Sequence, residues 1–446
     1  MNRTFLAFAT LLTLSVQGFA QSTPVDPDCP PEHEAMGHCK PKQAPVQAQG
    51  DGHFHAHLNQ FVVFGNGSGP RARSGFTAPN MFMLEVEKGF LKPRNSFKVE
   101  FMGTTDRWTT PAAGTPQLLQ TGEADENGRP YIDAQHPHSS PVMGLTFSNI
   151  LKLNEDGSKK LTFFFAPRGE ATAGPDTFMH RQSAAGNPDA PLSHHLQDFF
   201  HISSTVAGVK LNYGKVSVEG SAFSGFEPQP RKVNLDMHKP DSYAFRAKYK
   251  FNDFATVGGS IANVKPQHAE VPTGHSEPAQ GEIGHGELEH VPDEPAHGSE
   301  NQRAVVTAAW LTTQNEIGSG TLHNTVIWGH VQSEESLNGF LEEFVYNLGK
   351  NNFIGRVEVL QRTPDQLQIE VTPHGGKKWI SALTIGYERK IFTKQNVNTY
   401  LAGTYTQTFI PGSWSPAYGS SSPRSFKVFM RLGWSHMNMF GNKAKK

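Results

Sequence analysis

Histidine is the residue that most suggests chemistry in this sequence, because 21 histidines occur among 446 residues and several lie in short clusters. One cluster is His53, His55 and His57. Alternate residues of an extended strand lie on one face, so these side chains could bind a metal as a pair or a trio. Imidazole suits zinc, copper and nickel. The alternative is a strand that begins with exposed histidines and binds nothing.

A second cluster combines three kinds of metal ligand within eleven residues: Cys29, His33, Met36, His38 and Cys39. Thiolate, imidazole and thioether together favour soft or borderline metals such as copper or zinc. A small disulfide is the alternative, because both cysteines of the chain lie here and an exported protein meets oxidising conditions. The two interpretations overlap, since the histidines and Met36 could bind a metal beside a disulfide.

Two further groups lie in long polar segments. The first is Gln135-His136-Pro137-His138. The second runs from Phe178 to His201 and contains Met179, His180, His194, His195 and His201. If both segments lie on one side of the fold, they can meet as a metal-binding constriction. The alternative is ordinary loop packing, in which the histidines and Arg181 hold the segments together by hydrogen bonds.

The segment 265–301 mixes histidines with many carboxylates and has almost no apolar residues, so it is not expected to fold alone. Imidazole and carboxylate together suit weak, multi-site binding of Zn²⁺, Cu²⁺ or Ni²⁺, although the spacings match no structural zinc site. A solvated acidic loop is the alternative. Its histidines are His268, His275, His285, His290 and His297.

No catalytic set accompanies these histidines. The sequence has no Gly-x-Ser-x-Gly, Walker or His-Glu-x-x-His motif, so we do not expect an enzyme. The formal net charge is -1, which argues against a nucleic-acid partner, because such proteins carry strongly basic surfaces.

The N-terminus predicts export. Arg3 precedes an apolar stretch from Phe5 to Val16, and Gly18-Phe19-Ala20 is typical of a cleavage site. The apolar stretch is too short for the roughly 20 residues of a transmembrane helix. We therefore expect a signal peptide over 1–20 and a flexible periplasmic leader over 21–52, which is rich in Pro, Gln and Gly.

From residue 53 onward, segments of about ten residues alternate between apolar and polar side chains, as β-strands with two different faces do. We expect sixteen strands, at 53–64, 80–88, 96–104, 142–151, 159–166, 197–211, 215–224, 242–250, 254–264, 302–313, 322–332, 339–348, 352–361, 378–391, 397–409 and 425–436. Fourteen is the alternative, because the segments 53–64 and 159–166 are the least regular.

The connections between these strands alternate in length. Those after odd strands are mostly long, such as 105–141, 167–196 and 265–301, and those after even strands are short, such as 212–214. This alternation is typical of outer-membrane barrels with short periplasmic turns and long external loops. The prediction is an all-β, antiparallel up-and-down transmembrane β-barrel over 53–440, with a basic C-terminal tail over 441–446.

The polar face of each strand then faces the lumen of the barrel. In the last strand, Phe426, Val428 and Met430 share one face while Lys427 and Arg431 lie on the other. The same alternation predicts that the lumen is lined by Glu219, Arg246, Lys248, Glu358, Lys427 and Arg431.

Four segments carry a resemblance to a known family. They read AQHPHSS at 134–140, TFMHRQSAAGNPDAPLSHHLQDFFHIS at 177–203, VEGSAFSGFEPQ at 218–229 and DSYAFRAKY at 241–249. The chain resembles, from about Asn59 to Trp434, a family of outer-membrane proteins with little functional characterisation, often encoded beside copper or other heavy-metal efflux determinants. The resemblance implies a location and a metal context, and it supplies no mechanism.

The chain departs from the family pattern at three places. Ser139-Ser140 stand where the family has Asp-Leu, and Asp198-Phe199-Phe200-His201 stand where it has Asp-Ser-Thr-His. The acidic segment 265–301 also resembles an insertion.

Together these observations predict an exported outer-membrane barrel of a Gram-negative bacterium that binds or conducts heavy-metal cations, copper or zinc, at the cell surface. One alternative is a general or anion-selective porin with incidental histidines, and another is a structural or adhesive barrel with a closed lumen. No obligatory cofactor is expected beyond copper or zinc ions. The expected partners are outer-membrane lipid, metal ions or small solutes, and periplasmic metal-handling proteins.

Overall fold

The computed structural model describes residues 52–440 apart from 91, 126, 128, 139–140, 227, 229–232, 234, 266–302, 334–335 and 372–375. The predicted signal peptide, the leader with its five candidate ligands and the C-terminal tail lie outside the described residues, except Gly52. The five histidines of the acidic segment 265–301 also lie outside them.

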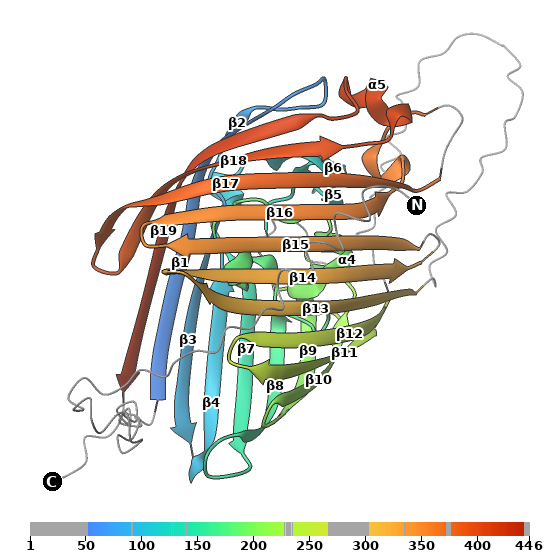
Figure 1. Cartoon of the computed structure of the whole chain (residues 1–446). Helices are drawn as coiled ribbons and strands as arrows, with labels where there is room; N and C mark the ends of the chain where they lie inside the picture. The colour runs from blue at the N-terminus through green and yellow to red at the C-terminus, as the bar shows by residue number, and fades with distance from the viewer. Residues whose placement is uncertain are drawn as a thin grey trace, which may run out of the picture. The chain divides into compact units, whose positions relative to one another are not determined.

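Within the described ranges, sixteen long antiparallel strands form a closed barrel (Figure 1). Each strand pairs with the next along the wall, and β1 pairs with β19 from Gly52↔Phe440 to Gly67↔Ser425. The strands are β1 Gly52–Gly67, β3 Asn80–Phe90, β4 Lys92–Gly103, β7 Val142–Lys152, β8 Lys159–Gly169, β9 Ser203–Tyr213, β10 Val216–Ser224, β11 Ser242–Asn252, β12 Ala255–Val264, β13 Ala304–Ile317, β14 Gly320–Gln332, β15 Leu337–Leu348, β16 Asn351–Arg362, β17 Lys378–Lys394, β18 Val397–Phe409 and β19 Arg424–Phe440. The predicted sixteen-stranded barrel is confirmed.

The alternation of side chains explains why these sequences form the wall. In β11, Tyr243, Phe245 and Tyr249 are 50%, 58% and 41% exposed, whereas Arg246 between them is buried. The register places Arg246 opposite Glu219 of β10, and the two form an ion pair at 2.8 Å. The outer face is therefore apolar and the inner face polar, as in barrels that span a membrane.

Short turns gather at one end of the barrel and long connections at the other, which we call the turn end and the loop end. The turn between β9 and β10 needs only Gly214 and Lys215, and Gly214 has a φ of +59°, which glycine adopts without strain. None of the helices in the described ranges is long and apolar enough to cross a membrane.

The long connections contain structure of their own. Short β2 (Gly75–Thr77) pairs with β1 beyond the end of β3. Residues 105–141, expected as a plain loop, contain α3 (Asp106–Thr109) and a hairpin of β5 (Thr115–Ala124) and β6 (Pro130–Gln135). Four further short elements are η4 (Asp365–Leu367), η5 (Gly412–Trp414), α5 (Ser415–Tyr418) and η3 (Phe199–His201).

Most predicted strand boundaries lie within about four residues of the observed ones, and one lies further away. The segment 197–211 was expected to be extended throughout, but the strand begins at Ser203. Residues before it form α4 (His194–Gln197) and η3, because the chain turns back on itself there: the Asp198 N–H donates to the His194 carbonyl at 3.0 Å.

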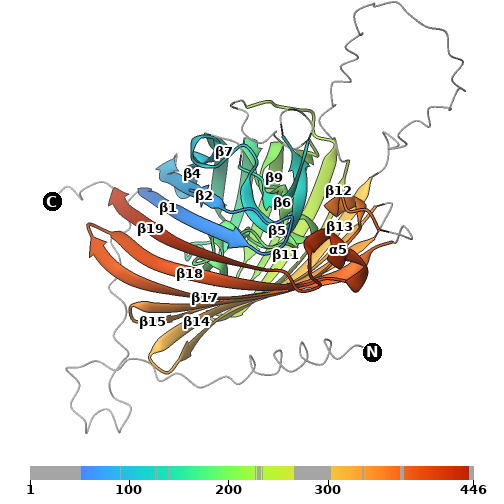
Figure 2. The same ribbon diagram turned by 90° about the horizontal axis from the view of Figure 1, so that it is seen from above.

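An apolar cluster joins the long connections at the loop end. Leu118 and Leu119 of the hairpin pack with Leu196 of α4, Leu367 of η4 and Trp414 of η5, all of them buried. Figure 2 shows the hairpin inside the circle of strands. The loops thus form a packed layer rather than independent extensions.

Candidate functional site

The connection between β8 and β9, residues 170–202, folds into the barrel, and we call it the inward segment. It contains η1 (Phe178–His180), η2 (Gln182–Ala184), α4 and η3. Helix α4 contacts β13, β14 and β15. Glycines in the wall allow this approach: a Cβ at Gly329 would lie 2.2 Å from the Leu196 carbonyl oxygen, and one at Gly339 would lie 2.9 Å from Leu196 Cδ1.

Buried ion pairs fasten the inward segment to the wall. Arg181 donates to Glu343 of β15 at 2.6 Å and to Asp198 at 2.8 Å, and Arg356 of β16 pairs with the same Glu343 at 3.0 Å. Burial alone would lower the pKa of Arg181, but the two carboxylates hold it above its usual value. Arg181 therefore stays charged, as the packing alternative for these loops requires.

The segment also reaches the opposite side of the lumen. The ring of His180 lies 6.4 Å from the ring of His57 of β1, centroid to centroid, while the next residue, Arg181, is bound to β15. Lys427 of β19 pairs with Asp189, and Glu358 of β16 accepts the Ser193 N–H at 3.3 Å. The inward segment thus crosses the barrel and narrows it.

Five imidazoles form a closed ring where the inward segment meets the residues after the hairpin, and we call them the histidine ring. Their centroids follow one another at 5.4, 5.6, 4.8, 5.1 and 6.0 Å. His195 is partly exposed, and the other four members are buried. In ring order the members are His136, His138, His201, His194 and His195.

Oxygen acceptors hold several of these rings from outside. His194 Nδ1 bonds the Asp198 carboxylate, His138 Nδ1 lies 3.3 Å from Asp106, and His201 Nδ1 lies 3.3 Å from the Asp198 carbonyl. His201 Nε2 is buried and has no hydrogen-bond partner among the described residues. A carboxylate or carbonyl on one ring nitrogen is the usual support of a histidine that binds metal through the other.

His136 is supported differently. Its Nε2 lies 3.0 Å from the Glu123 carboxylate of β5, so its Nδ1 is the nitrogen nearer the backbone, 3.3 Å from the Pro137 carbonyl. The hairpin thus contributes one carboxylate partner, and α3 contributes another through Asp106.

Three of the five imidazoles, His136, His195 and His201, favour the uncharged form. Burial, followed by the neighbouring imidazoles His138 and His194, lowers the pKa of His136 and of His201 well below 6.5, and burial with His194 does the same for His195. Burial would raise the pKa of Asp198, but His194 and Arg181 outweigh it and hold the pKa below its usual value. Neutral imidazole beside an ionised carboxylate is the form that binds metal ions.

The spacing of the rings suits a shared ion. With a metal–nitrogen bond of about 2.0–2.1 Å, two imidazoles on one tetrahedral ion have centroids about 5 Å apart. The observed separations from His201 are 4.8 Å to His194 and 5.6 Å to His138. Among the described residues, no three His, Cys, Asp or Glu side chains are placed to hold a metal as they stand, so binding requires the imidazoles to rotate.

The other predicted residues lie elsewhere in the barrel. His53 pairs with Glu85 of β3 at 2.9 Å, and the rings of His55 and His57 lie 5.4 Å apart. Met179 packs against the apolar cluster of Phe178, Ala184 and Ala190 rather than the histidine ring. Arg431 pairs with Glu388 of β17 at 2.6 Å.

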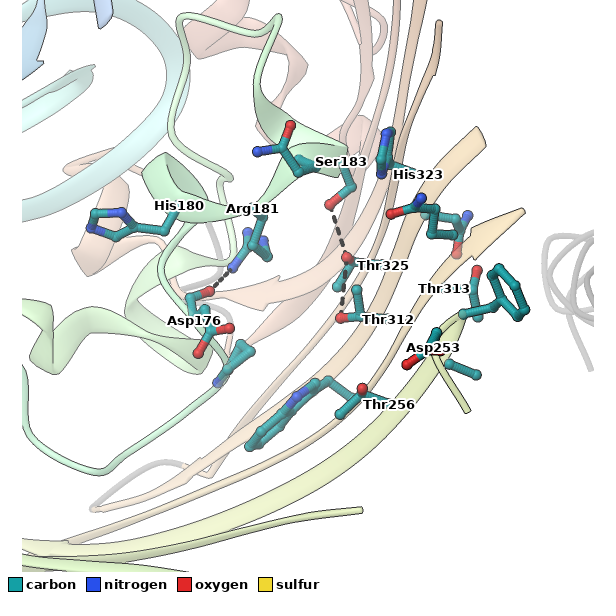
Figure 3. Close-up of a pocket in the computed structure, with 17 residues that line it drawn as sticks. Asp176, His180, Arg181, Ser183, Asp253, Thr256, Thr312, Thr313, His323 and Thr325 are labelled. Atoms are coloured by element: carbon teal, nitrogen blue, oxygen red, sulfur yellow. Dashed lines mark hydrogen bonds between the residues drawn. The ribbon is translucent and has the colours of Figure 1, made fainter. Parts of the chain in front are cut away.

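Two cavities flank the inward segment. One, of about 430 Å³, is lined by Glu219, Arg246, Lys248 and His180. The other, of about 230 Å³, lies between the inward segment and β12–β14 and is shown in Figure 3. There Ser183 donates to Thr325 at 2.8 Å, Thr312 and Thr325 lie 3.4 Å apart, and Arg181 donates to the Asp176 carbonyl at 2.9 Å.

Sequence reasoning missed the carboxylates around the histidine ring. Asp198 follows His194 by four residues, a separation that brings side chains together in one helical turn, so this pair could have been found. Asp106 and Glu123 carry no such signal, because they reach the ring only through the fold of residues 104–141.

No family model matches this chain, and no curated protein matches it in sequence. Solved structures with similar folds include in-vitro folded OmpT, an outer-membrane protein of Vibrio cholerae (9% identity, 88% of this chain and 100% of that chain, TM-score 0.44). Others are OmpF of Salmonella typhi in complex with daunomycin (8%, 86% and 97%, 0.49) and OprB of Pseudomonas putida (11%, 86% and 94%, 0.47).

Proposed function

We propose that this protein is an exported outer-membrane barrel whose lumen binds or conducts heavy-metal cations at the histidine ring. The observation that carries the proposal is the ring itself: five imidazoles in contact, with carboxylates or carbonyls holding the Nδ1 atoms of His138, His194 and His201. Imidazole nitrogen suits divalent zinc and copper. The apolar outer face supports the placement in a membrane.

The ring is attached to the segment that crosses the lumen. The inward segment that supplies three of its members crosses between β15 and β1, as Arg181 and His180 mark. A divalent ion in the buried ring would bring positive charge, and nearby carboxylates balance that charge. They belong to Asp106, Asp198 and Glu123.

Calorimetric titration of the purified full-length protein with Zn²⁺ and Cu²⁺ tests the proposal. We expect at least one site with a dissociation constant at or below about a micromolar, roughly -8 kcal/mol. His194→Ala with His201→Ala removes two adjacent members of the ring and should abolish that site. His323→Ala, a histidine beside the second cavity, is the matched control.

Retention of the same site by the double variant would contradict the proposal, because the binding would then belong to histidines outside the ring. Circular dichroism of each variant checks that the barrel is folded. Sites contributed by residues outside the ring remain in every variant and therefore cancel in the comparison.

A general or anion-selective porin is the second candidate. Basic side chains in a pore lining favour anions. The cavity of about 430 Å³ is lined by six basic and five acidic side chains: Lys98, Lys152, Lys160, Lys210, Lys248 and Arg246, with Glu87, Glu100, Glu170, Asp176 and Glu219. Single-channel recording in asymmetric potassium chloride separates the two. A reversal potential that favours chloride and does not respond to zinc supports the porin, whereas block by micromolar zinc that is lost in the double variant supports the metal site.

A further inference from the structure

A second set of metal ligands, different in chemistry from the histidine ring, lies on the wall across the lumen. Met102 of β4 is opposite Met83 of β3, and Met83 is opposite His57 of β1. Side chains directly opposite each other on neighbouring antiparallel strands have Cβ atoms about 4.5–5.5 Å apart and point to the same face. We call these three residues together with His180 the thioether–imidazole row.

The row faces the lumen. Leu84 and Val86, which alternate with Met83 and Glu85, are 41% and 40% exposed on the outer face. Glu85 lies on the inner face, where it pairs with His53 and Lys98. Met83 shares that inner face because it is two residues away from Glu85.

Two members of the row border a cavity. Met102 and His180 both line the cavity of about 430 Å³, and His180 lines the second cavity as well. Across from Met102, β7 carries Gly144, and the missing side chain leaves room for the Met102 side chain, whose methyl carbon lies 3.6 Å from where a Gly144 Cβ would be. His180 closes the row from above, with its ring 6.4 Å from that of His57.

Methionine on this face is not explained by packing. Among the described residues, neither Met83 nor Met102 belongs to a cluster of buried apolar side chains. Their inner-face neighbours along the strands are charged: Lys98 pairs with Glu85 at 3.2 Å and with Glu100 at 2.9 Å. Barrel interiors are polar, so two facing thioethers there are available as ligands rather than as core.

We propose that the thioether–imidazole row is a site for a soft monovalent cation, Cu⁺ or Ag⁺, held by the sulfur atoms of Met83 and Met102 and by the imidazole of His57, with His180 as a fourth ligand. Thioether is a soft ligand that selects Cu⁺ over hard cations, and imidazole binds copper as well. The ring, made of imidazoles and carboxylates, has the opposite preference, for divalent ions. This inference extends the proposed function along the same lumen, but it does not require the ring to bind metal.

The test follows individual methionine methyl groups by NMR in the full-length protein, labelled with [ε-¹³C]methionine and folded in detergent. Ag⁺ is the probe, because it resembles Cu⁺ and is not oxidised in air. Met83→Leu and Met102→Leu assign the two resonances and remove one sulfur each while nearly conserving volume. We expect both resonances to shift with Ag⁺ and neither to shift with Zn²⁺.

Sharing of one ion is tested by the same variants. In Met83→Leu, the Ag⁺ dissociation constant measured from the Met102 resonance should rise at least tenfold. In Met102→Leu, the constant measured from the Met83 resonance should rise at least tenfold as well. Met430→Leu, on the outer face of β19 where the side chain is 39% exposed, is the control and should leave both shifts intact.

Two outcomes overturn the inference: no Ag⁺-dependent shift at Met83 and Met102 in folded wild-type protein, or shifts at each that persist unchanged when the other is replaced. Failure of the proposed function is separate. If calorimetry shows no Zn²⁺ or Cu²⁺ at the histidine ring while Met83 and Met102 respond to Ag⁺, the ring is excluded as a metal site and the thioether–imidazole row stands.

Discussion

Two groups of histidines with the same spacing lie in opposite surroundings. His53, His55 and His57 alternate along β1, and His136 and His138 alternate after β6. The strand histidines line the lumen and are half-buried. His53 pairs with Glu85 and keeps 31% of its side chain exposed. His136 and His138 are about 5% exposed, inside a ring of imidazoles and carboxylates. Spacing therefore determines which side chains share a face, whereas the packing of distant loops determines what they can bind.

The largest expected effect comes from detaching the inward segment that builds the ring. Arg181→Ala removes the cation shared by the buried carboxylates of Glu343 and Asp198. Glu343 keeps Arg356 and Asp198 keeps His194, so we expect a cost near the lower end of the about 3–5 kcal/mol of a broken buried pair. We expect a lower midpoint of denaturant unfolding and a larger single-channel conductance, because the segment is released from β15. The strand histidines should keep their environment.

Lys248→Ala is the control for this prediction, because its partner Asp176 has 63% of its side chain exposed and exposed pairs contribute about 0–1 kcal/mol. Equal conductance and stability in Arg181→Ala and the control would mean that the apolar cluster alone holds the inward segment.

The second prediction compares a carboxylate partner from each group. Asp106→Asn removes the charged acceptor of His138, and we expect Zn²⁺ affinity at the ring to fall about 10–100-fold, as loss of outer-shell partners does. Glu85→Gln makes the equivalent change beside His53 and should leave that affinity unchanged. Calorimetry with both variants measures the difference, and equal losses would place the binding outside the ring.

The third prediction uses pH. The pKa values of His136, His195 and His201 are lowered by burial and by neighbouring imidazoles, so below pH 6.5 the unfolded chain binds more protons than the folded one. Stability should therefore be constant above about pH 7 and fall as the pH drops below 6.5, by up to about 1.4 kcal/mol per pH unit for each group. The decline should end once the lowered pKa values are passed.

His201→Gln should remove the contribution of one group from that slope. Unfolding midpoints measured between pH 7 and 5 give the slope for each protein. His436→Gln replaces an exposed histidine of β19 and should keep the wild-type slope. A His201→Gln protein with the full slope would show that His201 is protonated equally in both states.

The smallest effect is expected on β1. His53→Ala removes a partly exposed pair with Glu85, which still has Lys98 at 3.2 Å, so unfolding should change by about 0–1 kcal/mol. A loss of unfolding free energy comparable with that of Arg181→Ala would mean that His53 contributes as much to stability as the buried ion pairs of the inward segment.

Much of the wall could be predicted from local pattern. Alternation such as that of Phe426 to Arg431 marks both faces of a strand, the alternating segments indicate sixteen strands, and the loop lengths indicate a barrel. The exception before Ser203 lies where the alternation fails, because Phe199 and Phe200 are adjacent apolar residues after Gln197 and Asp198. The sequence suggested that residues 135–138 and 178–201 could meet, but the closed histidine ring itself could not be predicted. Which imidazoles come into contact depends on how residues 104–141 and 170–202 pack inside the barrel, and no local pattern encodes that packing.

The closure of the wall by β1 and β19 has a consequence for assembly. These two strands lie at opposite ends of the barrel sequence, yet they pair over sixteen positions, so the seam is the contact with the greatest separation along the chain and the greatest loop-closure cost. Residues 170–202 can enter before the seam forms or through the loop end afterwards. A disulfide engineered across β1 and β19 and closed early in folding distinguishes the two orders, because a cross-linked barrel reaches the heat-resistant native state only if the inward segment can still enter.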